Sequence, residues 1–278
     1  MDFYPLNLIL AVAVASATVF LGFLPTRNIR AGFFTQQVLL AIFAWALIGL
    51  TSPPAISHYH YITGFLCFAS WWQFRRDRTL AGKMWLSVAS GLGISVGIML
   101  ILAVTPRAYP AGLPQPTQSL LLASIYLGGA VIGLAYVCYV MIQALSSNTG
   151  VTQDQAQRYV GLLVGLVVAR AAVLLGQLFL MPSQSGLKVQ TYHLPETHNT
   201  FHLFGHEFTD IQFGRGMDMG ISLQNLIFMG LVFVILPTLA FIAQRAFRSG
   251  AKGRAASVLI GICLIGILTE SLARLLML

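Results

Sequence analysis

The stretch LIGICLIGILTESLARLLML, residues 259–278, closes the chain and is typical of a helix that crosses a membrane. Apolar and small residues come first, and two charged residues, Glu270 and Arg274, follow four positions apart. Residues four apart lie on one face of an α-helix, so these two side chains can pair with each other. Ionisable groups in a span are costly unless paired or hydrated. The pair therefore indicates either a structural contact between helices or a functional site.

The composition of the whole chain points to the same class of protein. Hydrophobic residues make up 57% of the 278 residues and charged residues 9%, whereas a typical soluble domain has about 25% charged residues. We therefore expect a polytopic membrane protein with one integral membrane domain over residues 1–278. Asp2 is the only charge before the first apolar segment, residues 6–23. We interpret that segment as a retained helix and not as a signal peptide.

A helix needs about 20 apolar residues to cross the hydrocarbon of a bilayer. Eight segments approach this length, and the third is the shortest of them. The fold class that we expect is an all-α membrane helix bundle with eight transmembrane helices. The predicted spans are residues 5–25, 33–52, 57–74, 84–104, 117–145, 157–181, 221–244 and 255–277.

Lysine and arginine residues are distributed unevenly between the loops. With the N-terminus outside, eleven of the sixteen fall in inner loops and three in outer loops. Because basic loops stay on the cytoplasmic side, we expect an N-out, C-out protein of a bacterial-type inner (cytoplasmic) membrane. A basic rim beside anionic lipid accounts for the net charge of +8, so no nucleic-acid partner is needed. The inner set is Arg27, Arg30, Arg75, Arg76, Arg78, Lys83, Arg158, Arg245, Arg248, Lys252 and Arg254, and the outer set is Arg107, Lys188 and Arg215.

Residues 183–220 form a long polar outer loop between the sixth and seventh spans. Long loops usually have a function. His198, His202 and His206 would share one face of a helix there and would suit zinc. The alternative is a loop that packs its aromatic residues against another subunit. We favour that alternative because Gly205 interrupts the turn and because apolar residues alternate along the segment as in strands.

One charged residue lies near the centre of a predicted span. Arg170, in the sixth span, needs a carboxylate, a carbonyl or a hydrated cavity there. Glu270 is the acidic residue that lies well inside a span, so we expect it to be the anionic partner. Gln177 is two turns further outward on the same helix. These residues and Arg274 form a candidate functional set near the outer face.

The histidines argue against a haem in this chain, because none of the six falls in the middle of a predicted span. His58 and His60 begin the third span. They are two residues apart and point to different sides of a helix, so at most one faces the bundle. Three cysteines, at positions 67, 138 and 263, have no metal-ligand spacing. We expect small buried residues, with no metal site and no iron–sulfur cluster in this chain.

Three stretches resemble the membrane anchor subunits of dimethyl-sulfoxide-reductase-type molybdoenzymes. The closing span keeps the Glu-x3-Arg spacing of that family's Gly-Glu-x-x-Gly-Arg motif, at Glu270 and Arg274. The fifth span carries Gly128-Gly129 and then Gly133, as in the family's Gly-Gly-x-x-x-Gly stretch. The entry to the second span follows a similar pattern at Arg30-Ala31, Gln36-Gln37, Phe43, Trp45 and Gly49.

Two departures from that family fall around the start of the third span. Thr51-Ser52-Pro53-Pro54 stands in place of a His-Leu-Gly motif associated with quinol binding. His58-Tyr59-His60 stands where the family has a glutamate. If a quinol site is present, it must use other residues.

The resemblance implies a subunit that exchanges electrons between membrane quinol or quinone (menaquinone or ubiquinone) and an iron–sulfur subunit docked outside. A molybdopterin catalytic subunit would complete the complex. This chain would be either a non-catalytic or a quinol-oxidising subunit. Quinol oxidation releases protons, so the site needs polar groups near the quinol oxygens. The residues that we expect to form it are His58, His60, Glu270, Arg274, Arg170 and Gln177.

Two other functions fit the same residues. In a small-solute transporter or channel, Arg170 and Glu270 would form the midplane site, although the two halves show no matching interrupted helices. In a purely structural assembly subunit, Glu270 and Arg274 would hold helices together. Co-purifying subunits distinguish an anchor from a transporter, and binding of a quinol analogue distinguishes an anchor from a structural subunit.

Overall fold

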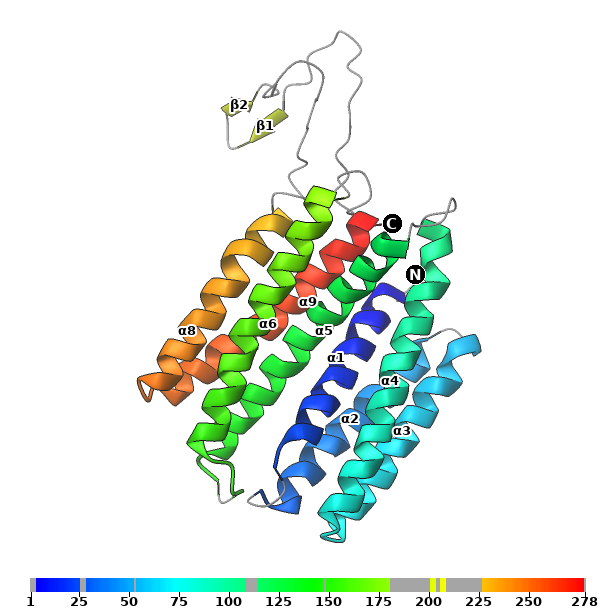
Figure 1. Cartoon of the computed structure of the whole chain (residues 1–278), viewed down its shortest axis with the longest axis vertical. Helices are drawn as coiled ribbons and strands as arrows, with labels where there is room; N and C mark the ends of the chain where they lie inside the picture. Colours follow the sequence, from blue (N-terminus) through cyan, green and yellow to red (C-terminus); the bar gives the residue numbers. More distant parts are fainter. Residues whose placement is uncertain are drawn as a thin grey trace.

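The structure, a computed structural model, describes residues 4–25, 29–52, 54–108, 115–147, 149–180, 201–203, 206–208 and 227–277. It is a bundle of long helices, as the apolar segments predict (Figure 1). The helices are α1 (Tyr4–Phe23), α2 (Ala31–Thr51), α3 (Pro54–Arg75), α4 (Thr79–Ala108), α5 (Gln115–Ala144), α6 (Gln153–Leu180), η1 (Gly230–Ile235), α8 (Leu236–Arg248) and α9 (Lys252–Met277).

Seven of the described helical segments are long and apolar enough to cross a membrane. The protein is therefore a multi-pass, all-α membrane protein. α3 is a regular helix of 22 residues but is not among the seven. Its sequence mixes His58, His60, Gln73 and Arg75 with its apolar residues, which lowers its hydropathy.

The seventh predicted span contains a π-helix. Residues 227–229 are helical, η1 follows, and α8 continues from Leu236 to Arg248 as one rod. A π-helix closes its hydrogen bonds over five residues and is often found at functional sites. The first residues of this predicted span, 221–226, lie outside the described residues, and the described helix runs past residue 244 to a turn at Ser249 and Gly250.

Packing divides the helices into two rings of four. In the N-terminal ring, α1, α2, α3 and α4 each pack against the next, and α4 packs back on α1. In the C-terminal ring, α5, α6, the η1–α8 rod and α9 do the same, and α9 packs back on α5. Each ring is a four-helix bundle with its own interior. Such interiors commonly house ligand and cofactor sites.

The two rings meet where α5 packs on α1. A Cβ atom added to Gly129 would lie 2.4 Å from Val12 Cγ1, and one added to Gly133 would lie 2.6 Å from the carbonyl oxygen of Ala13. Glycines four residues apart let two membrane helices approach closely. Gly129 and Gly133 therefore serve helix packing.

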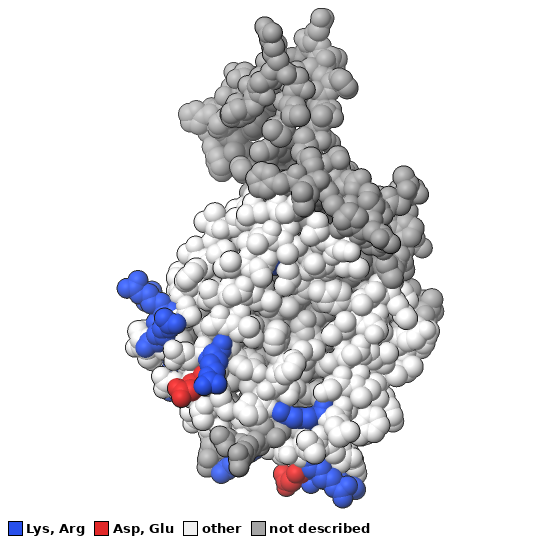
Figure 2. Space-filling view, in the orientation of Figure 1, with Lys and Arg blue, Asp and Glu red and all other residues white. Residues whose placement is uncertain are grey.

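The basic residues gather at one end of the bundle, as the loop assignment predicts (Figure 2). The described members of the inner set lie at the start of α2, at the ends of α3 and α8, and at the starts of α4, α6 and α9. Arg27 lies outside the described residues. α1 begins and α9 ends at the opposite end of the bundle (Figure 1).

Only two short stretches of the outer loop 183–220 are described. They are the strands β1 (Phe201–Leu203) and β2 (His206–Phe208), which pair antiparallel. His202 stands opposite Glu207 and His206 stands opposite Leu203, so the helical arrangement considered for these two histidines is wrong and the segment pairs as strands here. The rest of the loop, His198 included, lies outside the described residues.

Candidate functional site

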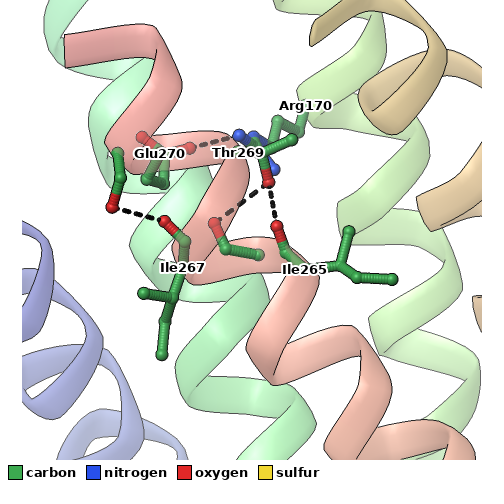
Figure 3. Close-up of polar contacts among 7 residues, drawn as sticks. Arg170, Ile265, Ile267, Thr269 and Glu270 are labelled. Carbon is green, nitrogen blue, oxygen red and sulfur yellow. Dashed lines mark hydrogen bonds and ion pairs between the residues drawn. The ribbon is translucent and has the colours of Figure 1, made fainter. Parts of the chain in front are cut away.

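A buried ion pair lies in the interior of the C-terminal ring. The Nη2 atom of Arg170, on α6, donates to Oε1 of Glu270, on α9 (Figure 3). The two side chains are 2% and 4% exposed. Charges removed from solvent must pair, and Glu270 is the partner that the sequence analysis predicts for Arg170. That prediction is confirmed.

The hydroxyl groups beside Glu270 serve their own helix. Thr269 donates to the carbonyl oxygens of Ile265 and Gly266, and Ser271 donates to that of Ile267 (Figure 3). These bonds run back by three or four residues along α9, as is common for such side chains in helices. Glu270 is thus the side chain of this turn that reaches across to α6.

Arg170 keeps spare hydrogen-bonding capacity. Its Nε and Nη1 atoms are buried and have no hydrogen-bond partner among the described residues. A guanidinium group carries five N–H donors and no acceptor, and a buried donor without a partner is costly. The guanidinium of Arg170 can therefore still donate a hydrogen bond to an acceptor oxygen within this apolar interior.

The apolar wall beside this position includes the π-helix. Leu174, one turn beyond Arg170 on α6, belongs to a small buried cluster with Phe228 and Val232. Val232 is the buried residue of η1. The helical irregularity of the seventh span thus packs against the helix that carries Arg170.

A second buried polar group lies in the N-terminal ring. His60, on α3, is 0% exposed, and its ring stacks on Trp45 of α2 with centroids 5.6 Å apart and planes 21° apart. His58 is exposed and its ring lies against that of Tyr59. The prediction that at most one of the two histidines faces the bundle is confirmed, and His60 is that residue.

The His60–Trp45 pair has three polar atoms without partners. Both ring nitrogens of His60 and the indole nitrogen of Trp45 are buried and make no hydrogen bond within the described part of the chain. A neutral imidazole offers one donor and one acceptor, and an indole offers one donor. Most buried polar groups in proteins are hydrogen-bonded, so these three atoms are candidates to bind a polar ligand.

Small residues surround the Trp45 ring. A Cβ atom added to Gly93 of α4 would lie 2.8 Å from Trp45 Cζ2 and 3.2 Å from the Cβ of Ala15, on α1. The indole therefore reaches across the N-terminal ring toward α1 and α4. The sequence places Trp45 in a span but does not reveal that it meets His60. The sequence does show that Trp45 and His60 lie at a similar depth in two consecutive spans, and this could have suggested their contact.

The structure does not bring the predicted residues together in one site. His60 lies in the N-terminal ring, where α3 packs against α2 and α4, while Arg170 and Glu270 lie in the C-terminal ring. α9 packs against α5, α8, η1 and α1, and Glu270 pairs with Arg170 of α6, so the expected site that joins Glu270 to the histidines of the third span is not formed. The positions of Gln177 and Arg274 are on α6 and α9, but their side chains lie outside the described ones.

The predicted burial is confirmed for two of the three cysteines. Cys67 and Cys138 are buried and Cys263 is half-buried, and all three are free thiols. Within the described residues, histidine, cysteine, aspartate and glutamate do not come together in any group of three or more that would suit a metal ion.

Comparison with protein-family models, with curated proteins and with solved structures gave no match for this chain.

Proposed function

We propose that this chain is the integral membrane anchor subunit of a multi-subunit oxidoreductase and exchanges electrons between membrane quinol and an iron–sulfur partner. In this proposal α3 is the eighth crossing helix, and both termini face the outer side of a bacterial-type inner membrane. The even number of crossings is consistent with α1 beginning and α9 ending at one end of the bundle. The basic opposite end would face the cytoplasm.

The observation that carries the proposal is the unpartnered imidazole of His60 against the unpartnered indole of Trp45. A quinol hydroxyl donates a hydrogen bond and a quinone carbonyl accepts one. A neutral imidazole can meet both needs, and the indole N–H can meet the second. The aromatic faces of the pair suit an aromatic head group. His60 is thus the best candidate for the group that binds a quinol oxygen.

Oxidation of one quinol releases two electrons and two protons. The unprotonated nitrogen of His60 would take the first proton from the quinol hydroxyl as general base and would pass it on before taking the second. The electrons would leave to an iron–sulfur cluster in the partner, because the three cysteines of this chain have no cluster spacing. Glu270 would act as a proton relay, and Arg170 would balance its charge.

The proposed partners dock on the outer face. They are an iron–sulfur electron-transfer subunit and a molybdopterin catalytic subunit, in keeping with the resemblance of Glu270, Arg274 and the Gly128-Gly129 stretch to anchor subunits of that family. The outer loop 183–220 carries the aromatic residues expected at an interface core. Deleting residues 190–212 should release the partners while the helices stay inserted.

Binding of a quinol analogue tests the His60 assignment. A fluorescent hydroxyquinoline N-oxide is titrated into the purified protein and its quenching is followed. His60→Phe keeps a stacked ring but removes both nitrogens, and Trp45→Phe removes the indole N–H. Each change should weaken binding about tenfold, since each removes a buried hydrogen bond.

His58→Phe is the matched control, because His58 is the exposed histidine two positions away on α3. It should leave the affinity for the analogue unchanged. Equal binding by the wild-type protein and the His60→Phe variant would refute the site. A wild-type protein that binds no quinol analogue and purifies without redox subunits would refute the function.

A transporter is the second candidate function, and the Arg170–Glu270 pair favours it. The pair lies inside a four-helix ring, and two nitrogen atoms of Arg170, which have no partner among the described residues, can donate to a solute oxygen. A transporter should purify alone and should move a solute in liposomes. An anchor should purify with cofactor-bearing subunits.

A further inference from the structure

The turn between α3 and α4 carries three arginines at the basic end of the bundle. They are Arg75, Arg76 and Arg78. The guanidinium carbon of Arg75 lies 5.3 Å from the ring centroid of Trp71, and that of Arg76 lies 4.6 Å from the ring centroid of Trp72. A guanidinium over an indole face is attracted to the ring. Two of the three cations are thus held on rings that α3 positions.

The backbone of this turn is fixed by a helix-ending motif. Asp77 has a φ of 56°, and its N–H donates to the carbonyl oxygen of Phe74 at 3.0 Å. The N–H of Arg78 donates to the carbonyl oxygen of Gln73, also at 3.0 Å. These two bonds around a left-handed residue form a Schellman motif. The arginines therefore project from a defined turn.

The turn is also anchored to the core. The ring of Phe74 is 1% exposed and stacks on Phe34 of α2, with centroids 5.0 Å apart and planes 11° apart. Ser70 donates to the carbonyl oxygen of Gly82 at 2.7 Å and ties α3 to α4. A cluster held in this way loses little conformational freedom when it binds a ligand.

A nearby lysine belongs to the protein's own packing. The ammonium of Lys83 donates to the carbonyl oxygen of Leu24, beyond the end of α1, and lies 5.8 Å from the ring centroid of Phe34. In contrast, Arg75, Arg76 and Arg78 are exposed. The indole N–H of Trp71, under Arg75, is a buried donor that has no partner in the part of the chain that the structure describes.

We propose that this turn binds the phosphate of an anionic phospholipid. Three arginines against the single carboxylate of Asp77 leave an excess of positive charge. Guanidinium groups match the oxygens of a phosphate, and basic positions next to membrane helices attract anionic head groups. The indole of Trp72, 42% exposed, would lie at the level of the head groups. An anionic lipid is required because a zwitterionic head group would bring its own cation into the arginine cluster.

The turn between α8 and α9 supplies a matched control. It carries Arg245, Arg248, Lys252 and Arg254 at the same end of the bundle. Among the described residues, the cation–π contacts are those of Arg75, Arg76 and Lys83, so these control cations are not held on aromatic rings. A site built by the Trp–Arg pairs should distinguish the two turns, and diffuse surface charge should not.

The test measures lipid affinity by native mass spectrometry of the purified protein in detergent, titrated with phosphatidylglycerol or with phosphatidylcholine. The double variant Arg75→Gln, Arg76→Gln should bind phosphatidylglycerol about tenfold more weakly, because two charge-assisted contacts are lost. The double variant Arg245→Gln, Arg248→Gln should stay within about twofold of the wild type. Phosphatidylcholine should bind weakly to all three proteins.

A second variant keeps every charge and guards against misfolding of the first. Trp71→Phe with Trp72→Phe preserves aromatic bulk but weakens the cation–π contacts and removes the free indole donor, so binding should fall about threefold or more. Equal losses in the two arginine double variants would overturn the proposal in favour of diffuse charge. Equal wild-type affinity for the two lipids, or no effect of the tryptophan changes, would also overturn it.

Discussion

Gly128 faces the carboxylate of Glu270 so closely that no side chain fits between them. A Cβ atom added to Gly128 would lie 1.9 Å from Glu270 Oε1 and 2.4 Å from its Cδ. The next residue, Gly129, faces Val12 of α1 instead. Glu270 thus lies against α5, and its position depends on α5 as well as on α6 and α9.

The first prediction follows from this contact. Gly128→Ala should displace the Glu270 carboxylate and lower the free energy of unfolding by about 1–3 kcal/mol, the usual cost of overpacking. Thermal unfolding of the purified protein in detergent measures the effect. Gly165→Ala on α6 is the control, because nothing lies within 4 Å of an added Cβ atom there. A Gly128→Ala protein that melts like the control would contradict this account of the glycine.

The second prediction concerns the ion pair itself. Arg170→Met leaves the charge of Glu270 without its partner on α6, and Glu270→Leu leaves the guanidinium of Arg170 buried and unpaired. Each single change should cost about 3–5 kcal/mol, whereas the double variant should recover most of that loss because an apolar pair needs no compensation. Melting temperatures of the four proteins complete the double-mutant cycle. Additive losses would show that the two charges are not coupled.

The Arg170–Glu270 pair was predictable from sequence because membrane burial leaves few options. A charge near the centre of a span needs an opposite charge or a cavity, and Glu270 was the acid well inside a span. The membrane helix bundle and the gathering of basic residues at one of its ends were also predictable, because hydropathy and loop charge are averages over many residues.

The separation of His60 and Glu270 into different rings was not predictable from the sequence. The position of a residue along a span gives its depth but not its lateral neighbours, and two helices at one depth can belong to different rings. Trp45 became a partner of His60 only through the packing of α2 on α3. The π-helix in the seventh span was also not predictable, because the residues from Gly230 to Ile235 are a continuous apolar run that would suit an α-helix equally well.

A third prediction tests the topology. Single cysteines replace Ser146, an exposed residue in the α5–α6 turn at the basic end, and Thr200 in the outer loop. A membrane-impermeant thiol reagent added to intact cells should label the cysteine at 200 and spare the one at 146, as expected for a basic cytoplasmic end. Cys67 and Cys138 are buried and should give little background. Labelling of both sites from outside would refute the N-out, C-out arrangement.

The last prediction separates a relay role of Glu270 from a structural one. Glu270→Gln keeps the shape of the side chain and still offers an oxygen to Arg170, but an amide cannot carry a proton at neutral pH. If Glu270 relays protons away from the N-terminal ring, the variant complex should assemble normally and oxidise quinol about 100-fold more slowly, a typical loss for general acid–base catalysis. If the pair only holds α6 against α9, assembly and turnover should fall together. Subunit yield after purification gives the first quantity, and quinol oxidation per assembled complex gives the second. Normal turnover in a fully assembled Glu270→Gln complex would exclude the relay, since the proton would then leave by a path that does not use this carboxylate.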